Sequence, residues 1–435
     1  MEKNKLKELI ITHKEKFLSK KELIRRTVQK TTTNYIKSRE IVLITGVRRS
    51  GKSSLMKLIA DDITSEYKLP ASNILYLNFE DERFLDFNFK DFESLYEIFL
   101  EIEKPNGKKF FFLDEIQNIK GWEKWVNRLY VYEDVKVFIT GSNATLLSSE
   151  ISSALTGRNR QIILWPFSFC EYLSLNNASF SHKDLFATRK KVLIKTLFNE
   201  YLSLGGFPEV IKQKDATLLE QYFKDIIYRD LFARYSIRKM KEFKELCLYL
   251  ISNTGTICSY ENLRNLIDAK NVTTIKNYLD YLENVFLFFR VPLFDYSVKT
   301  QIYNPGKFYA VDVGLAKSIG FKFSENSGRI FENIVFLELK RENKEFYYWK
   351  SKNGTEVDFV IREGLKIRES IQVCYTLGDK KTRERETRSL IATRNELASQ
   401  NLTIITDDEE GEEKTGDVRI KIMPLWKWLL HRDNQ

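Results

Sequence analysis

The feature that most constrains this chain is a glycine-rich stretch between an apolar run and a helix-forming segment. It reads Gly46-Val47-Arg48-Arg49-Ser50-Gly51-Lys52-Ser53 and matches the pattern GxxxxGK[ST]. The preceding run is EIVLIT and the following segment is SSLMKLIADDI. A phosphate-binding loop works only in this context, because its amides and the helix N-terminus must face the same ligand. The stretch therefore predicts a strand, loop and helix within a parallel sheet.

Each part of this loop has an expected role in holding a nucleoside triphosphate. The glycines let backbone amides close around phosphate oxygens, Lys52 reaches the β and γ phosphates, and the Ser53 hydroxyl binds Mg²⁺. The expected ligands are ATP and Mg²⁺. The predicted binding residues are Gly46, Val47, Arg48, Arg49, Ser50, Gly51, Lys52, Ser53 and Ser54.

Two further apolar runs end in polar residues. The run FFFL is followed by Asp114 and Glu115, and the run VKVFIT leads into Ser142 and Asn143. Asp114 is expected to hold Mg²⁺ through water, and Glu115 to polarise the attacking water. An alternative is that Glu115 only stabilises a helix dipole. Asn143 is favoured over Ser142 as the residue that senses the γ phosphate.

The order of the predicted elements divides the chain into parts. Residues 40–165 alternate β-type runs with helices, which is typical of an α/β core with a parallel sheet covered on both faces. Strand signals stop after residue 165, so residues 166–239 are predicted to form a helical lid. Residues 240–300 show three short helices and a strand pair, which predicts a winged helix-turn-helix. Residues 301–435 form a second α/β unit.

Positive charge is concentrated near the N-terminus. The chain has 70 Lys and Arg against 60 Asp and Glu, a net charge of +10, and residues 1–39 form a predicted basic helical segment. This segment is interpreted either as attracting phosphate backbones or as a solvated helix face. The acidic stretch 407–413 is expected to be an exposed loop. The three histidines, His13, His182 and His431, are expected to be superficial or incidental.

Composition excludes other classes of protein. With 43% hydrophobic residues and seven Pro among 435 residues, the chain is neither collagen-like nor wholly disordered. No apolar run approaches the roughly 20 residues that cross a bilayer. No signal-peptide pattern is present at the N-terminus. A cytoplasmic protein without a membrane partner is therefore expected.

Several motifs together resemble a known family. GVRRSGKSS, FFLDEIQNIKGWEKWV, ITGSNATLLS, LTGRNRQIILWPFSFCEYL and YLSLGGFPEV look like those of bacterial and archaeal AAA-type ATPases with a C-terminal nuclease-like domain of unknown function. The resemblance covers nearly the whole chain after its first few tens of residues. It implies that the arginines of the block LTGRNR are candidates for an arginine finger supplied to a neighbouring subunit, and hence a homo-oligomer; Arg158 is favoured among them. A structural ion pair is the alternative for Arg158.

The C-terminal unit resembles a restriction-endonuclease-like, PD-(D/E)xK fold. The resemblance places Glu332, Asp358, Gln372 and Cys374 at the positions of the acids and the lysine of such a site. Gln372 has no negative charge and Cys374 is not cationic, so an inactive remnant is expected. Neighbouring Glu356 or Lys366 remain as candidates to compensate.

The predicted winged helix offers candidate DNA contacts. Thr273, Thr274, Lys276 and Asn277 lie near the start of a helix that would present side chains to a major groove. Winged helices also serve as protein contacts, so both uses remain open.

Taken together, these patterns predict an AAA-type protein that binds ATP and Mg²⁺, hydrolyses ATP, and acts on DNA. The alternatives are a nucleotide-gated protein-interaction switch with little turnover and an ATP-gated, metal-dependent nuclease. A small-molecule kinase is disfavoured, because the sequence shows no acceptor pocket and the acids at 114 and 115 suit water activation.

Overall fold

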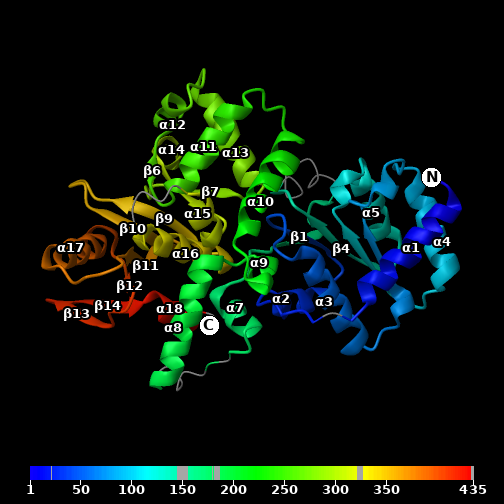
Figure 1. The fold of residues 1–435 in the computed structure, drawn as a ribbon, viewed down its shortest axis with the longest axis horizontal. Coiled ribbons are helices and arrows are strands. Elements are labelled where there is room, and N and C mark those ends of the chain that lie inside the picture. Colours follow the sequence, from blue (N-terminus) through cyan, green and yellow to red (C-terminus); the bar gives the residue numbers. More distant parts are fainter. Residues whose placement is uncertain (21, 145–154, 179, 181–186, 321–326, 433–435) are drawn as a thin grey trace. The chain divides into compact units, whose positions relative to one another are not determined.

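The computed structural model describes residues 1–20, 22–144, 155–178, 180, 187–320 and 327–432. The chain divides into two compact units (Figure 1). Unit 1 consists of Met1–Trp165 with Asn284–Phe286, and unit 2 consists of Pro166–Glu283 with Leu287–Gln435. His182 lies outside the described residues.

Unit 1 is built on a parallel sheet of five strands. The sheet order is β2-β3-β4-β1-β5, and every neighbouring pair is parallel. The predicted parallel α/β core is thus confirmed. Because β3, β4 and β1 are parallel neighbours, their carboxyl ends meet at one edge of the sheet, where ligands bind in such sheets. The strands are β1 (Ile41–Thr45), β2 (Ile74–Asn78), β3 (Lys109–Asp114), β4 (Val135–Gly141) and β5 (Asn159–Ile163).

Helices cover both faces of this sheet. Alternate residues of β3 point to opposite faces: Phe111 and Leu113 belong to one hydrophobic core, and Phe110 and Phe112 to the other. Helices α4 and α5 contribute to the first core, and α2 and α3 to the second. The helices are α1 (Lys3–Leu18), α2 (Gln29–Ile36), α3 (Lys52–Ser65), α4 (Asp91–Glu103) and α5 (Trp122–Tyr132), with short 3₁₀ turns at Ala71–Asn73, Glu82–Phe84 and Ile116–Asn118.

The N-terminal helix α1 is part of this unit rather than a detached basic arm. Its apolar side is buried, with Leu9 in the first core and Phe17 in the second. Its lysines contact acids of α4: Lys3 and Lys7 lie 3.1 and 3.3 Å from Glu101. These contacts favour the interpretation of α1 as a helix with a solvated, ion-paired face.

Unit 2 begins with helices in the region predicted as a lid. These helices pack on a later helix, α15 (Val313–Ile319), through α8 and α10, so the contacts of the chain group them with unit 2. They are α7 (Phe169–Leu175), α8 (Thr188–Leu204), α9 (Pro208–Gln213) and α10 (Thr217–Asp225), followed by a π-helical stretch at Ile226–Phe232.

The break between α8 and α9 is a Gly205-Gly206 pair packed against Asp312. The amide of Gly206 donates to Oδ2 of Asp312 at 2.6 Å, and a Cβ atom on Gly206 would lie 2.4 Å from the carbonyl oxygen of Phe167. Gly205 has a φ of 72°, and a Cβ atom there would lie 2.1 Å from Asp312. The two glycines are therefore required by close packing as well as by the turn.

Four helices and a three-stranded sheet follow in the described part of the chain. The sheet order is β6-β8-β7, with both pairs antiparallel. We expected the C-terminal unit to begin at residue 301. Strand β8 lies beyond that residue but belongs to this small sheet, so the sheet extends past the expected boundary. The elements are α11 (Met240–Ser252), β6 (Ile257–Cys258), α12 (Tyr260–Leu266), α13 (Val272–Asn284), β7 (Phe288–Val291), α14 (Val298–Tyr303) and β8 (Gly306–Ala310).

The last part of unit 2 is a mixed sheet of six strands in the order β13-β14-β12-β11-β10-β9. Strands β9, β10 and β11 form an antiparallel meander, and β12 then pairs parallel to β11. Part of the acidic stretch that we expected to be a loop forms the edge strand β13, which pairs with β14. The elements are α16 (Ser327–Arg341), β9 (Glu345–Lys350), β10 (Glu356–Glu363), β11 (Lys366–Val373), α17 (Lys380–Leu397), β12 (Asn401–Thr406), β13 (Gly411–Thr415), β14 (Val418–Pro424) and α18 (Leu425–Arg432).

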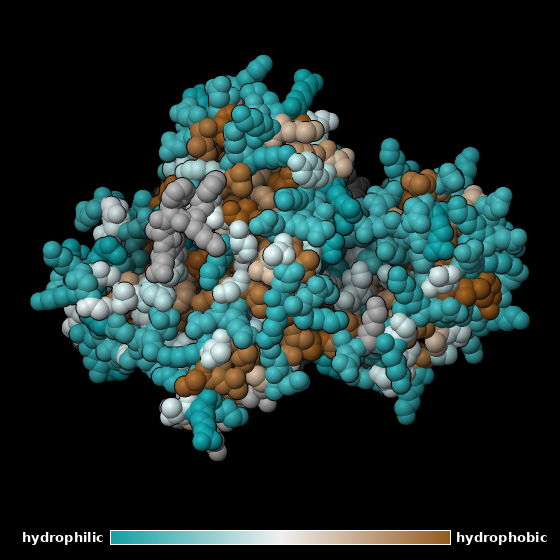
Figure 2. All heavy atoms as spheres, viewed as in Figure 1, coloured by the Kyte–Doolittle hydropathy of each residue, from teal (hydrophilic) through white to brown (hydrophobic). Residues whose placement is uncertain are grey.

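Hydrophilic residues cover most of the visible face, and apolar residues form scattered patches (Figure 2). In the described part of the chain, no helix combines the length and the apolar character needed to span a membrane.

Candidate functional site

The loop after β1 has the backbone that its glycines predict. Gly46 has a φ of 147°, and a Cβ atom there would lie 2.2 Å from the carbonyl oxygen of Leu164. Gly51 has a φ of 99° and is the N-cap residue of α3. Since glycine has no side chain to cap a helix, the first-turn amides of α3 are left to face a ligand.

Lys52 is buried where this loop meets the end of β3. Its Nζ atom donates to the carbonyl oxygens of Gly46 at 3.1 Å and Val47 at 3.2 Å. The same atom lies 3.7 Å from Oε1 of Glu115. The ammonium group is thus held between the loop and the second predicted catalytic residue.

Other loop residues are fixed by their surroundings. Arg48 pairs with Glu80 at 3.0 Å, and Arg49 has a φ of 69°. The Oγ atom of Ser50 is buried and has no hydrogen-bond partner among the described residues. An unpartnered hydroxyl inside a loop of this type fits a phosphate acceptor.

Sequence reasoning missed the contribution of Arg26, which supports the loop from the N-terminal segment. This buried arginine donates to the carbonyl oxygen of Ser50 at 3.1 Å and to that of Trp165 at 2.8 Å. It ties the loop to the chain that follows β5. In the sequence, Arg26 is one of several basic residues in the N-terminal segment, and nothing in the neighbouring residues distinguishes it from the others.

Asp114 is buried at the carboxyl end of β3 and accepts hydrogen bonds from two side chains. Tyr76 donates through Oη at 2.9 Å and Thr140 donates through Oγ1, and the hydroxyl of Ser53 also lowers the pKa of Asp114. Burial raises the pKa of Asp114 and the charge of Glu115 adds to this effect, while the hydroxyls of Ser53, Thr140 and Tyr76 oppose it. The contact brings the two predicted Mg²⁺ ligands, Ser53 and Asp114, together.

Glu115 follows in a left-handed backbone conformation, with a φ of 51°. Its amide donates to Oγ1 of Thr140 at 3.0 Å, and its Oε2 atom accepts from the amide of Ser142 at 3.2 Å. Thr140 therefore holds both acids, since its hydroxyl accepts from one residue and donates to the other. The alternative role for Glu115 is to stabilise a helix dipole. The helix that begins next to Glu115 is only the short 3₁₀ turn Ile116–Asn118.

Asn143 is buried just beyond β4, between the ends of β3 and β1. This position suits a group that faces both the loop and the acids. Residues 145–154 follow outside the described part of the chain, and these include part of the motif ITGSNATLLS.

Arg158 lies near the amino ends of the parallel strands, whereas the loop lies at their carboxyl ends. It precedes β5, and its carbonyl oxygen accepts from the amide of Ile41 at the start of β1. Its guanidinium group donates to Asn127 and lies 5.5 Å from the ring centroid of Tyr130. Within its own chain, Arg158 is thus about 15 Å or more from the loop, given roughly 3.3 Å per strand residue.

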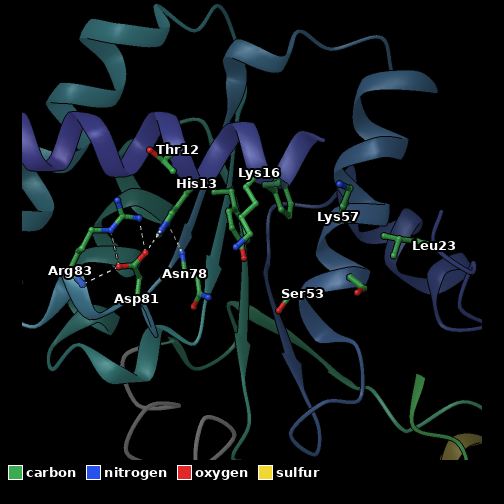
Figure 3. A pocket seen from close by; sticks show the side chains of 12 residues that line it. Thr12, His13, Lys16, Leu23, Ser53, Lys57, Asn78, Asp81 and Arg83 are labelled. Atoms are coloured by element: carbon green, nitrogen blue, oxygen red, sulfur yellow. Dashed lines mark hydrogen bonds and ion pairs between the residues drawn. The ribbon is translucent and has the colours of Figure 1, made fainter. Parts of the chain in front are cut away.

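A cavity of about 270 Å³ lies beside Ser53, between α1, α3 and β2 (Figure 3). His13 of α1 lines this cavity and is buried, so the expectation of a superficial histidine is wrong. Its Nε2 atom bonds Oδ2 of Asp81 at 2.9 Å, and its Nδ1 atom accepts from the amide of Asn78 at 3.3 Å. His13 thereby fixes α1 to the end of β2. Phe17, one turn later, stacks on Tyr76 with ring centroids 4.0 Å apart.

The predicted DNA contacts on α13 are only partly available. Thr273 and Asn277 are exposed. Thr274 is engaged in capping, because its amide and hydroxyl both donate to Oδ1 of Asn271, at 2.9 and 3.0 Å. Lys276 lies over the rings of Tyr260 and Tyr303, at 5.2 and 5.6 Å from their centroids.

The acids of the C-terminal unit converge on a lysine that sequence reasoning missed. Lys307 of β8 places its Nζ atom 2.7 Å from Asp358, 2.8 Å from Glu332 and 2.9 Å from Glu356. Burial alone would lower the pKa of Lys307, but Asp358 and Glu332 outweigh it and raise the pKa well above its ordinary value. Burial, together with the charge of Asp358, raises the pKa of Glu332 to about 7. A lone lysine within the apolar strand GKFYA was the available signal.

The other two residues of the predicted remnant are neutral groups with structural partners. The side chain of Gln372 accepts from the amide of Asp358 at 3.2 Å and donates to Glu386 at 2.7 Å. Burial raises the pKa of the Cys374 thiol to about 11. Lys366 lies at the far end of β11 from Gln372, roughly 20 Å away by strand geometry, and so cannot compensate. Glu356 does join the cluster.

Family models match three consecutive parts of the chain. Residues 38–173 match a family described as an AAA domain. Residues 195–325 and 327–428 match two families described as domains of unknown function, DUF8612 and DUF4143. The boundary between the latter two falls after α15, well beyond residue 300.

The chain is similar over most of its length to two curated proteins. It is 38% identical to the uncharacterized protein MJ1544 of Methanocaldococcus jannaschii, covering 90% of this chain and 88% of that protein. It is 33% identical to an uncharacterized protein of Haemophilus influenzae, covering 80% and 85%. Among solved structures, the Orc1 protein of Aeropyrum pernix in complex with DNA aligns with a TM-score of 0.31 at 11% identity, covering 68% of this chain and 92% of that one.

Proposed function

The chain belongs to the same family as the uncharacterized protein MJ1544 of Methanocaldococcus jannaschii and matches the AAA domain over residues 38–173, and from this premise we propose that it binds ATP with Mg²⁺ and hydrolyses it. One observation carries the proposal. The sheet order brings the loop after β1, the acids after β3 and Asn143 after β4 to one edge, with Lys52 and Glu115 3.7 Å apart.

The loop residues supply the phosphate site. The amides of residues 46 to 54 and the ammonium group of Lys52 would bind the phosphates, and the orphan hydroxyl of Ser50 adds a polar group inside the cradle. Ser53 and Asp114, which interact closely enough for the Ser53 hydroxyl to lower the pKa of Asp114, would hold Mg²⁺. When bound, this ion would neutralise negative charge on the β and γ phosphates.

Glu115 is assigned as the general base. Water attacks the γ phosphorus, the bond from that phosphorus to the bridging oxygen of ADP breaks, and the proton of the water passes to the carboxylate of Glu115. Asn143 would orient the water or the γ phosphate. Thr140 holds Asp114 and Glu115 in register through one hydroxyl.

The test is steady-state turnover of ATP together with nucleotide binding. Glu115→Gln should retain ATP binding and lose turnover by about 100-fold or more, whereas Lys52→Ala should lose binding. Glu97→Gln, at an exposed acid of α4, is the matched control and should behave as wild type. Turnover in Glu115→Gln equal to that of the control would refute the assignment.

Arg158 remains a proposed finger that acts on a neighbouring copy. Arg158 is too far from the loop of its own chain to contact a nucleotide bound there, so as a finger it would act on the nucleotide bound by another subunit. Arg158→Ala should then reduce turnover in an assembled sample, and mixing it with Lys52→Ala should restore part of that turnover. A structural arginine would give no such complementation.

DNA is the proposed target. Support comes from the net charge of +10 and from α11 to α13 with the sheet β6-β8-β7, an arrangement that we interpret as a winged helix-turn-helix. Duplex, single-stranded or branched DNA should stimulate turnover at fixed salt, and Thr273→Ala with Asn277→Ala should reduce the effect. Turnover that no DNA changes would contradict this target.

One observation favours the second candidate, a nucleotide-gated protein-interaction switch. The segment between β7 and β8 exposes apolar side chains, with Tyr296 80% and Tyr303 69% exposed. Exposed aromatic groups of this kind are typical of protein contacts. Slow turnover, tight nucleotide retention and indifference to DNA would place the switch first.

A further inference from the structure

The acid cluster of the C-terminal unit contains its own cation. We propose that Lys307 occupies the place where a divalent metal ion would lie among Glu332, Glu356 and Asp358, so that this site binds no metal. The lysine instead joins β8 of the small sheet to the six-stranded sheet. The proposal is independent of ATP binding.

The geometry leaves no room for a metal at the point of convergence. Three carboxylate oxygens lie within 2.7 to 2.9 Å of the Nζ atom of Lys307. A Mg²⁺ ion would need oxygen ligands about 2.1 Å away around the same point. The ammonium group and the ion therefore exclude each other.

Lys307 cannot easily leave this position. Its side chain is 3% exposed, and its strand β8 is the central strand of the small sheet, where Lys307 pairs with Ile257 on one side and Val291 on the other. Removing the ammonium group from the carboxylates would require movement of this central strand or an unfavourable rotamer in a packed interior.

Two of the acids also accept hydrogen bonds from other donors. Oδ2 of Asp358 accepts from the amide of Val373 at 2.9 Å, and Oε1 of Glu332 accepts from the hydroxyl of Tyr309 at 2.6 Å. At the position where the resemblance calls for another acid, the neutral side chain of Gln372 accepts from the backbone amide of Asp358 and donates to Glu386. The donor set thus fits a buried lysine and does not fit Mg²⁺.

The proposal is tested by titrating the full chain with Mn²⁺ alone. Electron paramagnetic resonance measures the concentration of free Mn²⁺ at each step of the titration. Wild type and Asp358→Asn should give the same binding isotherm, because the cluster holds no metal in either. Lys307→Met should bind one Mn²⁺ ion more than wild type does. The double variant with Asp358→Asn should lose that ion, and Lys307→Arg, which keeps the charge, should not gain it.

Two results would overturn the proposal. One is an Mn²⁺ ion bound by wild type and lost in Asp358→Asn. The other is a folded Lys307→Met variant that gains no ion. If Lys307→Met does not fold, the comparison of wild type with Asp358→Asn still decides.

A cleavage assay gives an independent readout. Supercoiled plasmid incubated with wild type and either Mg²⁺ or Mn²⁺ should stay intact. Nicking that Asp358→Asn abolishes would show that Lys307 assists a metal-dependent nuclease rather than replacing its metal.

Discussion

Lys52 and Glu115 form a buried ion pair, with Nζ 3.7 Å from Oε1. The two residues follow β1 and β3, which are separated in the sheet by β4. The ammonium group that would bind a phosphate is therefore already in contact with the proposed general base. Glu115 and the phosphates of a nucleotide compete for the same cation.

This competition predicts the affinity of a variant that lacks the charge. Glu115→Gln should bind ATP about threefold to tenfold more tightly than wild type, since the loss of one ion pair of about 1 kcal/mol frees Lys52. Equilibrium binding of a fluorescent ATP analogue measures the change. Weaker binding by Glu115→Gln would show that the pair orients Lys52 instead of competing for it.

Tyr76 is predicted to position Asp114 for Mg²⁺. Tyr76→Phe removes the donor to Oδ2 of Asp114 and should raise the Mg²⁺ concentration for half-maximal turnover by about tenfold, as for other outer-shell partners of metal ligands. Tyr96→Phe is the matched control, because Tyr96 donates to Glu133 on a different element. Equal Mg²⁺ dependence in both variants would show that Tyr76 does not position Asp114 for Mg²⁺.

Helix α1 is predicted to contribute to the stability of unit 1. Leu9 is fully buried in its core, whereas Ile11 on the same helix is 42% exposed. Leu9→Ala should lower the free energy of unfolding by about 2 to 5 kcal/mol, and Ile11→Ala by less than about 0.5 kcal/mol. Chemical denaturation checks the difference, and a similar small effect from both would mean that α1 is not integral to the unit.

Gln372 is predicted to be required as an amide. Gln372→Glu would place a second carboxylate 2.7 Å from Glu386, where like charges repel, and should lower the free energy of unfolding by about 1 to 3 kcal/mol at pH 7. Because low pH protonates one of the two carboxylates, the loss should be smaller at pH 5. The double variant Gln372→Glu with Glu386→Gln restores one amide and one acid and should recover most of the stability.

Asp312 predicts a pH dependence of stability in unit 2. Burial raises the pKa of Asp312 to about 6 from its ordinary value of 3.8. Between these values the folded state binds more protons than the unfolded chain, so stability falls as pH rises, and the loss is complete above pH 6. Relative to wild type, Asp312→Asn should therefore gain about 1 kcal/mol between pH 5 and pH 7. Parallel pH profiles for the two proteins would contradict the shift.

The sequence by itself determined the local elements that carry nucleotide chemistry. The glycines at 46 and 51 indicate a backbone with positive φ, and the apolar runs before Asp114 and Ser142 indicate buried strands. These features are legible because backbone conformation and strand burial depend on residues adjacent in the chain. The same local reasoning indicated a second α/β unit near the C-terminus, although it missed the edge strand β13.

Only the tertiary structure decided which side chains meet. Tyr76 and Thr140 reach Asp114 because β2 and β4 flank β3, and His13 is buried because α1 packs against β2. Lys307 reaches Glu332 and Asp358 from a strand of another sheet. Such contacts depend on strand order and on packing between elements far apart in sequence. Local patterns of residue spacing therefore do not predict them.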